Sequence, residues 1–141
     1  MLSKIIMWGA LTLAASALLF GVWLRIWPNV ENGKKLTEQN CGFCHDLTSN
    51  QKNKQGPFLW GVVNRVPGSV QYGYSTAFLT AVGDKSFVWD DDHLKLFITN
   101  PAAFIPKNRM SSPDASHPKI FKGIESAANR RDIIAYLNTL K

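Results

Sequence analysis

The sequence brings two cysteines and a histidine together in one short motif. Cys41 and Cys44 are the only cysteines of the 141-residue chain, and His45 directly follows the second. At the end of a helix, positions i, i+3 and i+4 project from the same face. The spacing Cys-x-x-Cys-His is typical of covalent haem attachment, in which both thiols form thioethers with the haem vinyl groups and the imidazole binds the iron. The motif therefore predicts a c-type haem site.

Three other interpretations use the same cysteine pair: a redox-active dithiol, half of a zinc site, or a structural disulfide. A dithiol enzyme would carry a β-α-β pattern around the pair, and the sequence shows none. A zinc site would need a second pair of ligands, whereas His93 and His117 are far apart in the sequence. The surrounding sequence favours haem attachment.

Met110 is the candidate for a second axial ligand of the iron. Met1 and Met7 fall in an apolar N-terminal segment, so Met110 is the only methionine in the rest of the chain. It follows Pro106 closely, in a stretch without helical periodicity. A thioether opposite a histidine raises the reduction potential of a haem, which suits an electron carrier.

The chain begins with a long apolar segment. Residues 5–24 contain no charge, and as a helix they would cover about the 30 Å hydrocarbon core of a bilayer. Lys4 precedes the run and Arg25 follows it, while Trp23 and Trp27 stand where interfacial aromatic residues lie. The segment is predicted to span a membrane.

A cleaved signal peptide is the alternative, because Ala15-Ser16-Ala17 has the small-x-small pattern of a processing site. The apolar run continues well past this point, which favours an uncleaved anchor. Either reading exports the rest of the chain and places it on the periplasmic side of the inner membrane. The chain then divides into a signal anchor with one transmembrane helix (residues 1–27), a short linker (28–32) and a haem domain (33–141).

Local signals predict short helices joined by long loops. The first helix opens near Glu31 and leads into the cysteine motif. Two further helices each begin at a side chain that can cap a helix and end at a breaking residue. They run from Ser75 to Val82 with a stop at Gly83, and from Asp90 to Thr99 with a stop at Asn100-Pro101.

The last helix is expected over residues 126–140, with its apolar residues at spacings of three and four. Lys141 would then lie near the negative end of the helix dipole. The apolar face consists of Ile133, Ile134, Leu137 and Leu140. The overall pattern predicts an all-α fold.

Composition narrows the classes of partner. The net charge of +6 at pH 7, from 16 Lys and Arg against 10 Asp and Glu, is modest for a nucleic-acid-binding protein and suits an acidic partner surface. We therefore expect no nucleic acid. Two cysteines are too few for a disulfide-rich scaffold, and the length allows one domain of ordinary size.

From about Glu31 to Lys141 the sequence resembles the class I cytochrome c family, of the mitochondrial and alphaproteobacterial type and its membrane-anchored bacterial relatives. The matching segments occur in the order ENGKKL, CGFCH, GPFLWGVVNR, YGYS, NPAAFIP and RRDIIAYL. The resemblance implies helices and loops wrapped around one haem, here preceded by the N-terminal transmembrane helix.

The resemblance also implies roles for individual residues. The carbonyl of Pro57 would accept the Nδ1 proton of the iron-binding histidine. Gly33 would meet Tyr136 where the first and last helices cross. Four further residues match positions that surround the buried haem propionates in the family. These are Arg65, Tyr72, Tyr74 and Trp89.

The sequence departs from the family in two places near the methionine. Phe97 stands where the mitochondrial type has a tyrosine, so one hydroxyl is absent. After Met110 the chain carries SSPDASHPK before the family pattern resumes. This insertion leaves His117 and Lys119 as rival sixth ligands.

For function, the resemblance implies a non-enzymatic carrier of single electrons. A quinol–cytochrome c oxidoreductase would be the donor and a terminal haem–copper oxidase the acceptor, with basic residues around the haem edge meeting acidic partner surfaces. The candidates are Lys35, Lys54, Lys107 and Arg109. The alternative is a haem protein with an open sixth position that binds a small gas or acts as a peroxidase.

Overall fold

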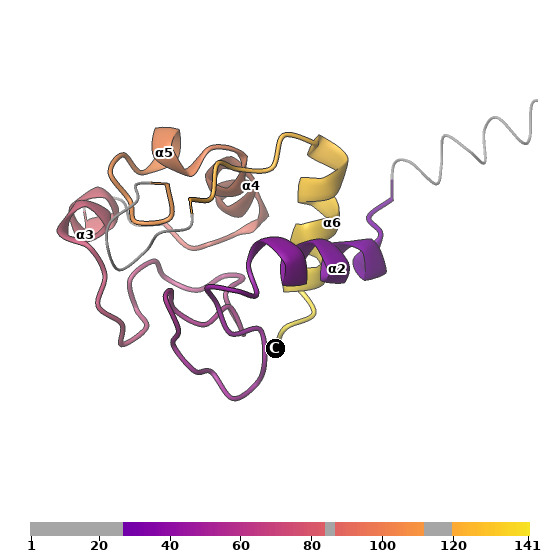
Figure 1. Ribbon diagram of the computed structural model, residues 1–141, viewed down its shortest axis with the longest axis horizontal. Coiled ribbons are helices and arrows are strands. Elements are labelled where there is room, and N and C mark those ends of the chain that lie inside the picture. Colours follow the sequence, from indigo (N-terminus) through magenta and orange to yellow (C-terminus); the bar gives the residue numbers. More distant parts are fainter. Residues whose placement is uncertain (1–26, 84–86, 112–119) are drawn as a thin grey trace, which may run out of the picture.

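The computed structural model describes residues 27–83, 87–111 and 120–141. Within them the regular structure is helical throughout, which confirms the predicted all-α class (Figure 1). Long loops connect the helices. The helices are α2 (Val30–Asn40), α3 (Thr76–Gly83), α4 (Asp91–Thr99), α5 (Pro101–Phe104) and α6 (Ala127–Leu137).

Helix α2 begins inside the segment that the sequence predicts to be a linker. The side chain of Asn29 accepts a hydrogen bond from the backbone N–H of Asn32 and so caps the first turn. The backbone N–H of Asn29 and the side-chain amide of Asn32 both donate to the buried carboxylate of Asp132 on α6. These bonds attach the start of the domain to its last helix.

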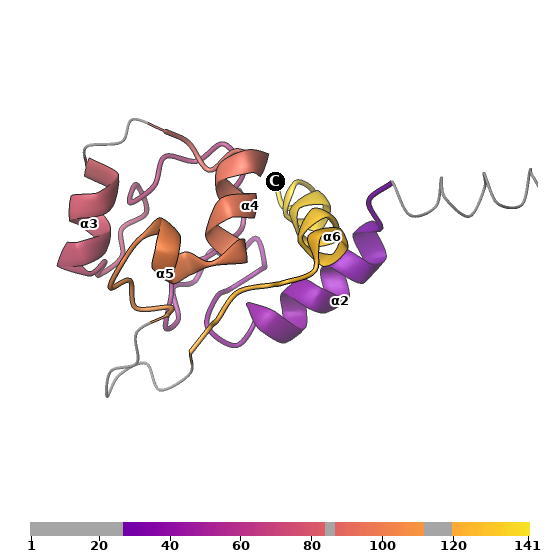
Figure 2. The ribbon, with the colours of Figure 1, turned by 90° about the horizontal axis from the view of Figure 1, so that it is seen from above.

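Helices α2 and α6 cross in close contact, and both views show them against each other at one end of the molecule (Figures 1 and 2). Gly33 lies at the crossing. A Cβ atom there would lie 1.9 Å from the carbonyl oxygen of Asp132 and 3.1 Å from Cβ of Tyr136. The predicted meeting of Gly33 and Tyr136 is confirmed, and the tightest contact is with the backbone of Asp132.

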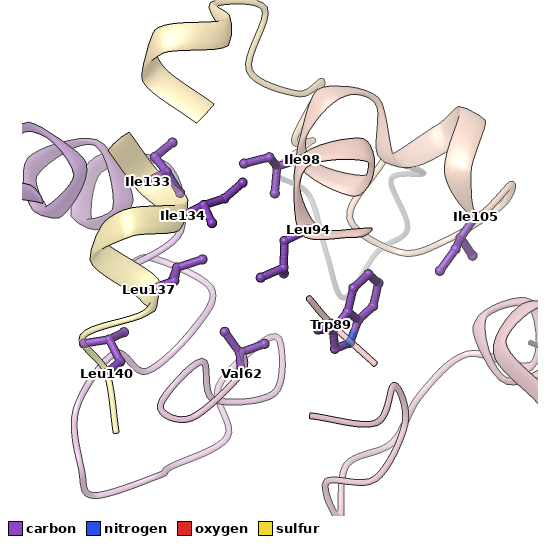
Figure 3. Packing of buried hydrophobic residues seen from close by; sticks show 9 residues of the cluster. All are labelled: Val62, Trp89, Leu94, Ile98, Ile105, Ile133, Ile134, Leu137 and Leu140. Carbon is purple, nitrogen blue, oxygen red and sulfur yellow. The ribbon is translucent and has the colours of Figure 1, made fainter. Parts of the chain in front are cut away.

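The apolar core lies between α6 and α4. In Figure 3, Leu94 and Ile98 of α4 point toward the buried face of α6. The four apolar residues predicted for this face are all buried, and Val62, Trp89 and Ile105 complete the cluster. Helix α6 ends at Leu137, so Leu140 reaches the core from the following turn.

Helices α3 and α4 begin directly after the residues that were expected to cap them. The side chains of Ser75 and Asp90 accept backbone N–H groups from the first turns of α3 and α4. Asn100 ends α4 and also caps α5 through the N–H of Ala103. The short helix α5 was not predicted, because Asn100-Pro101 was interpreted only as a stop.

The predicted transmembrane segment, residues 5–24, lies outside the described residues. Among the helices of residues 27–83, 87–111 and 120–141, none combines the length and apolar character needed to cross a bilayer.

Candidate functional site

A large apolar cleft lies between the loops that follow α2 and the helices α4 and α6. Its empty volume, counting the open mouth, is about 1360 Å³. All nine residues that the sequence predicts for the haem site line this cleft. They are Cys41, Cys44, His45, Pro57, Arg65, Tyr72, Tyr74, Trp89 and Met110.

The cysteine motif forms one further turn beyond α2. The backbone N–H groups of Cys44 and His45 both donate to the carbonyl of Cys41, at 3.0 and 2.9 Å. This turn gives the two thiols and the imidazole the spacing of a single helical face. All three side chains reach the cleft, as the motif predicts.

Residues 54–57, Lys-Gln-Gly-Pro, hold this turn from outside, and we call them the clamp segment. The N–H of Gly56 donates to the carbonyl of Cys44 at 2.8 Å. The ammonium of Lys54 donates to the carbonyls of Gly42 and His45, at 2.9 and 3.3 Å. Every position of the clamp segment contacts the motif, because Gln55 accepts from the Cys44 thiol at 3.3 Å and Pro57 bonds to the imidazole.

The imidazole of His45 is fixed in orientation by Gly56 and Pro57. Its Nδ1 lies 2.6 Å from the carbonyl oxygen of Pro57. Because a carbonyl only accepts, Nδ1 carries the proton and Nε2 keeps a lone pair for a metal. A Cβ on Gly56 would lie 2.3 Å from Cε1 of the ring, so only glycine leaves room here.

Burial lowers the pKa of His45, and the bond to Pro57 opposes this effect. The nearby charges of Lys54 and Arg65 lower the pKa further. The ring is therefore neutral at pH 7, as a metal ligand must be. The geometry and the protonation state both fit a haem iron ligand.

The cysteines do not resemble a redox dithiol. Burial, reinforced by the neighbouring Cys44, raises the pKa of the Cys41 thiol to about 12, whereas reactive C-x-x-C pairs have lowered values. Both thiols are free, so they form no disulfide. Residues 27–83, 87–111 and 120–141 contain no group of three or more His, Cys, Asp or Glu side chains that could hold a metal.

The four propionate candidates lie together along the cleft wall, and several of their donors already have protein partners. The guanidinium of Arg65 donates to the carbonyls of Phe58 and Trp60, at 2.7 and 3.1 Å. The hydroxyl of Tyr72 donates to the carbonyl of Gln55. These contacts fix the wall in place, while the role of the four residues toward propionates stays a prediction.

Tyr74 and Trp89 contribute aromatic surface to the same wall. Tyr74 stacks on Phe78 with ring centroids 4.8 Å apart, and burial raises the pKa of its hydroxyl. Trp89 is 7% exposed and lies 5.1 Å from the ring of Phe97. Phe97 therefore adds apolar surface to the cleft wall next to Trp89.

Met110 enters the cleft from the loop after α5, and Asn108 holds that loop. Asn108 is 2% exposed, and its side-chain amide donates to the carbonyls of Pro101 and Ile105, at 2.8 and 2.6 Å. It also bonds to Ser111 through both the backbone N–H and the hydroxyl of that residue. Asn108 is a site residue that the motifs of the sequence do not indicate. The one signal in the sequence is its position two residues before the candidate ligand.

The rival ligands His117 and Lys119 lie in residues 112–119, outside the described part of the chain. On the described side of this segment, the carbonyl of Met110 accepts the N–H of Phe121 at 2.7 Å. This bond joins the described residues on the two sides of that segment.

Comparison with known proteins agrees with this site. The family model for cytochrome c matches residues 30–141. This chain belongs to the cytochrome c family. A cytochrome c of Euglena viridis is 40% identical over 116 residues, which is 80% of this chain and 98% of the relative. Cytochrome c2 of Pararhodospirillum photometricum is 34% identical, over 77% of this chain and 95% of the relative.

Membership in the class I cytochrome c family makes this chain a monohaem electron carrier with covalently bound haem c. A cytochrome c homologue of Bradyrhizobium diazoefficiens is 37% identical over 79% of this chain, and the match covers 54% of that protein. The residues present fit the haem. The cleft is apolar, both thiols are free at its edge, and the imidazole is oriented by its bond to Pro57 in space that Gly56 leaves open.

Proposed function

We propose that this protein is a membrane-anchored cytochrome c that carries single electrons in a bacterial respiratory chain. Its donor is a quinol–cytochrome c oxidoreductase and its acceptor a terminal haem–copper oxidase. The haem domain faces the periplasm from a single-pass anchor in the inner membrane. The arrangement that carries the proposal is the cleft that joins the cysteine motif, the oriented His45 and Met110.

The haem is held through four side chains in this proposal. Cys41 and Cys44 would form the thioethers, and His45 and Met110 would bind the iron. The haem would supply a centre that gains or loses one electron. With two protein ligands on the iron, no position would stay open for a substrate, which accords with a carrier and not an enzyme.

The protein's own contribution is to hold the ligands still and keep water out. Gly56 and Pro57 fix the imidazole plane, and Asn108 fixes the loop of Met110. The apolar side chains of the cleft exclude solvent, which is one of the factors that set the potential of a haem. Ligands that do not rearrange suit repeated one-electron exchange.

Exposed basic residues support an acidic partner surface. Lys35 and Lys107 are exposed, which suits long-range attraction to such a surface. Arg109 and Lys54 are also exposed, but their charged groups donate to backbone carbonyls of the protein itself, Arg109 to that of Gly73 at 2.9 Å. Lys35 and Lys107 are therefore the cleaner positions for testing partner binding.

The anchor and the short connection to it set the position of the domain. The apolar run of residues 5–24 precedes Trp27, which is 58% exposed, and α2 begins only three residues later. A chain extends at most about 3.5 Å per residue, so the domain is held close to the membrane surface. Its electron donor and acceptor are then neighbours in one assembly.

An intact mass of the protein purified from membranes tests this proposal. We expect the full chain plus one haem, which requires covalent attachment of the haem and an uncleaved anchor. The ferric spectrum should show the weak red absorption band of methionine ligation, and Met110→Ala should abolish it. A chain that lacks residues 1–17 would overturn the anchor, a mass without haem would overturn the whole proposal, and a high-spin ferric spectrum would favour gas binding or peroxidase activity.

A further inference from the structure

Lys54 stands out because its charge is directed at the haem-attachment turn. Its ammonium donates to the carbonyls of Gly42 and His45, at 2.9 and 3.3 Å, which lie on either side of Cys44. The carbonyl of Cys44 itself accepts the N–H of Gly56, and that of Cys41 accepts from two N–H groups of the turn. Carbonyls at the end of a helix lack partners within the helix. Lys54 supplies the partners for two of them.

The charge of Lys54 also lies close to the residue proposed to bind the iron. Its ammonium is 3.3 Å from the carbonyl oxygen of His45. An iron bound to that ring carries one more positive charge when oxidised than when reduced. A cation held nearby destabilises the oxidised state by Coulomb repulsion.

We propose that Lys54 is a positioning residue of the haem site, which closes the attachment turn and raises the reduction potential. This role differs from that of a lysine that binds a redox partner, because it is exerted within the isolated protein. The inference rests on the proposed attachment of haem at Cys41 and Cys44. It does not depend on the identity of the donor or the acceptor.

The test compares three variants of the full-length, haem-loaded protein in detergent, without any partner. Lys54→Gln removes the charge, and Lys54→Arg keeps a charge and donors. Lys52→Gln removes one charge from an exposed position on the same loop. The midpoint potential is measured by redox titration at low and high salt. Asp46, which also senses the Lys54 charge, is unchanged in all three variants.

Lys54→Gln should lower the equilibrium constant for reduction about threefold, or about 28 mV at 59 mV per tenfold change. Lys54→Arg should stay near the wild type and Lys52→Gln should shift less than Lys54→Gln, with the difference shrinking at high salt. Amide hydrogen exchange at Gly56 should speed up in Lys54→Gln alone, because the turn is loosened.

Equal shifts in Lys54→Gln and Lys52→Gln would overturn the inference, since any loop charge would then do the same. An unchanged potential in Lys54→Gln would also overturn it. Both outcomes leave the proposed function intact, because the wild type would still carry its haem. A wild type without thioether-bound haem would overturn the proposed function and, with it, this inference.

Discussion

Gly33 and Gly56 both allow close contacts, but the contacts serve different purposes. A Cβ at Gly33 would meet the backbone carbonyl of Asp132 on α6, while a Cβ at Gly56 would meet the imidazole of His45. The first contact joins two helices whose backbones cannot yield. The second controls the orientation of one side chain. The α2–α6 crossing thus serves the stability of the fold, and the clamp segment serves the chemistry of the site.

The two sites differ in how the structure could make room for an added Cβ atom. At the crossing, Asp132 is bonded to Asn29 and Asn32, so the helices cannot separate without losing those bonds. At the clamp segment, the ring of His45 can rotate if it gives up its bond to Pro57. A substitution at Gly33 should therefore destabilise the fold, and one at Gly56 should alter the haem site first.

Gly33→Ala is expected to have the largest effect. Alanine favours a helix over glycine by about 1 kcal/mol, but a Cβ 1.9 Å from a carbonyl oxygen forces the helices apart. We expect the free energy of unfolding to fall by about 3 kcal/mol or more, measured by urea denaturation of the haem-loaded protein. The visible spectrum of the folded fraction should stay that of the wild type.

Gly73→Ala is the matched control, because a Cβ there has no atom within 4 Å. Its stability should lie within about 0.5 kcal/mol of the wild type. If Gly33→Ala were equally harmless, the close crossing of α2 and α6 would not contribute to stability as argued.

Gly56→Ala should affect the haem site more than the fold, the opposite of Gly33→Ala. The new methyl group overlaps the ring of His45, which must turn and weaken its bond to Pro57. We expect a loss of about 2 kcal/mol in stability, together with a changed ferric spectrum and a shifted midpoint potential. A stability loss with an unchanged spectrum and potential would mean that Gly56 is only a packing position.

Features that depend on contacts within a short stretch of chain could be predicted from the sequence. Helix starts at Ser75, Asp90 and Ser126 were predictable because a capping side chain acts within its own first turn. The cysteine motif and Met110 were identified by spacing and uniqueness. The short helix α5 also has a local cap, Asn100 with Pro101 after it, but the same two residues end α4, and only the stop was inferred from them.

Lys54 and Asn108 show why part of the site stayed hidden. In sequence, Lys54 is one lysine among several in a polar loop, and it was predicted to contact a partner. Its contact with the carbonyls of Gly42 and His45 arises only when the loop folds back on the turn. Asn108 likewise reads as a loop residue, and only the folded chain buries it.

A substitution at Asp46 should have a smaller effect than Gly33→Ala or Gly56→Ala. It tests the loop around the site independently of the helix crossing. The carboxylate of Asp46 is 7% exposed and accepts the N–H of Lys52 at 3.0 Å and two bonds from Thr48. These bonds, that from Lys52 first, lower the pKa of Asp46 below its ordinary value. Ionised Asp46 therefore stabilises the folded state above the unfolded pKa of about 3.9, and this contribution is lost as the pH falls through the lower folded value.

Asp46→Asn should accordingly flatten the loss of stability between pH 5 and about pH 3, as measured by urea denaturation across this range. Asp92→Asn, on the exposed surface of α4, is the control and should keep the slope of the wild type. Asp46 lies next to His45 in the chain. The variant should therefore lose the haem-site spectrum at a different pH from the wild type. Gly33 and its contacts should stay unaffected. An identical acid profile in Asp46→Asn and the wild type would show that these hydrogen bonds persist in the unfolded chain or do not favour the ionised carboxylate.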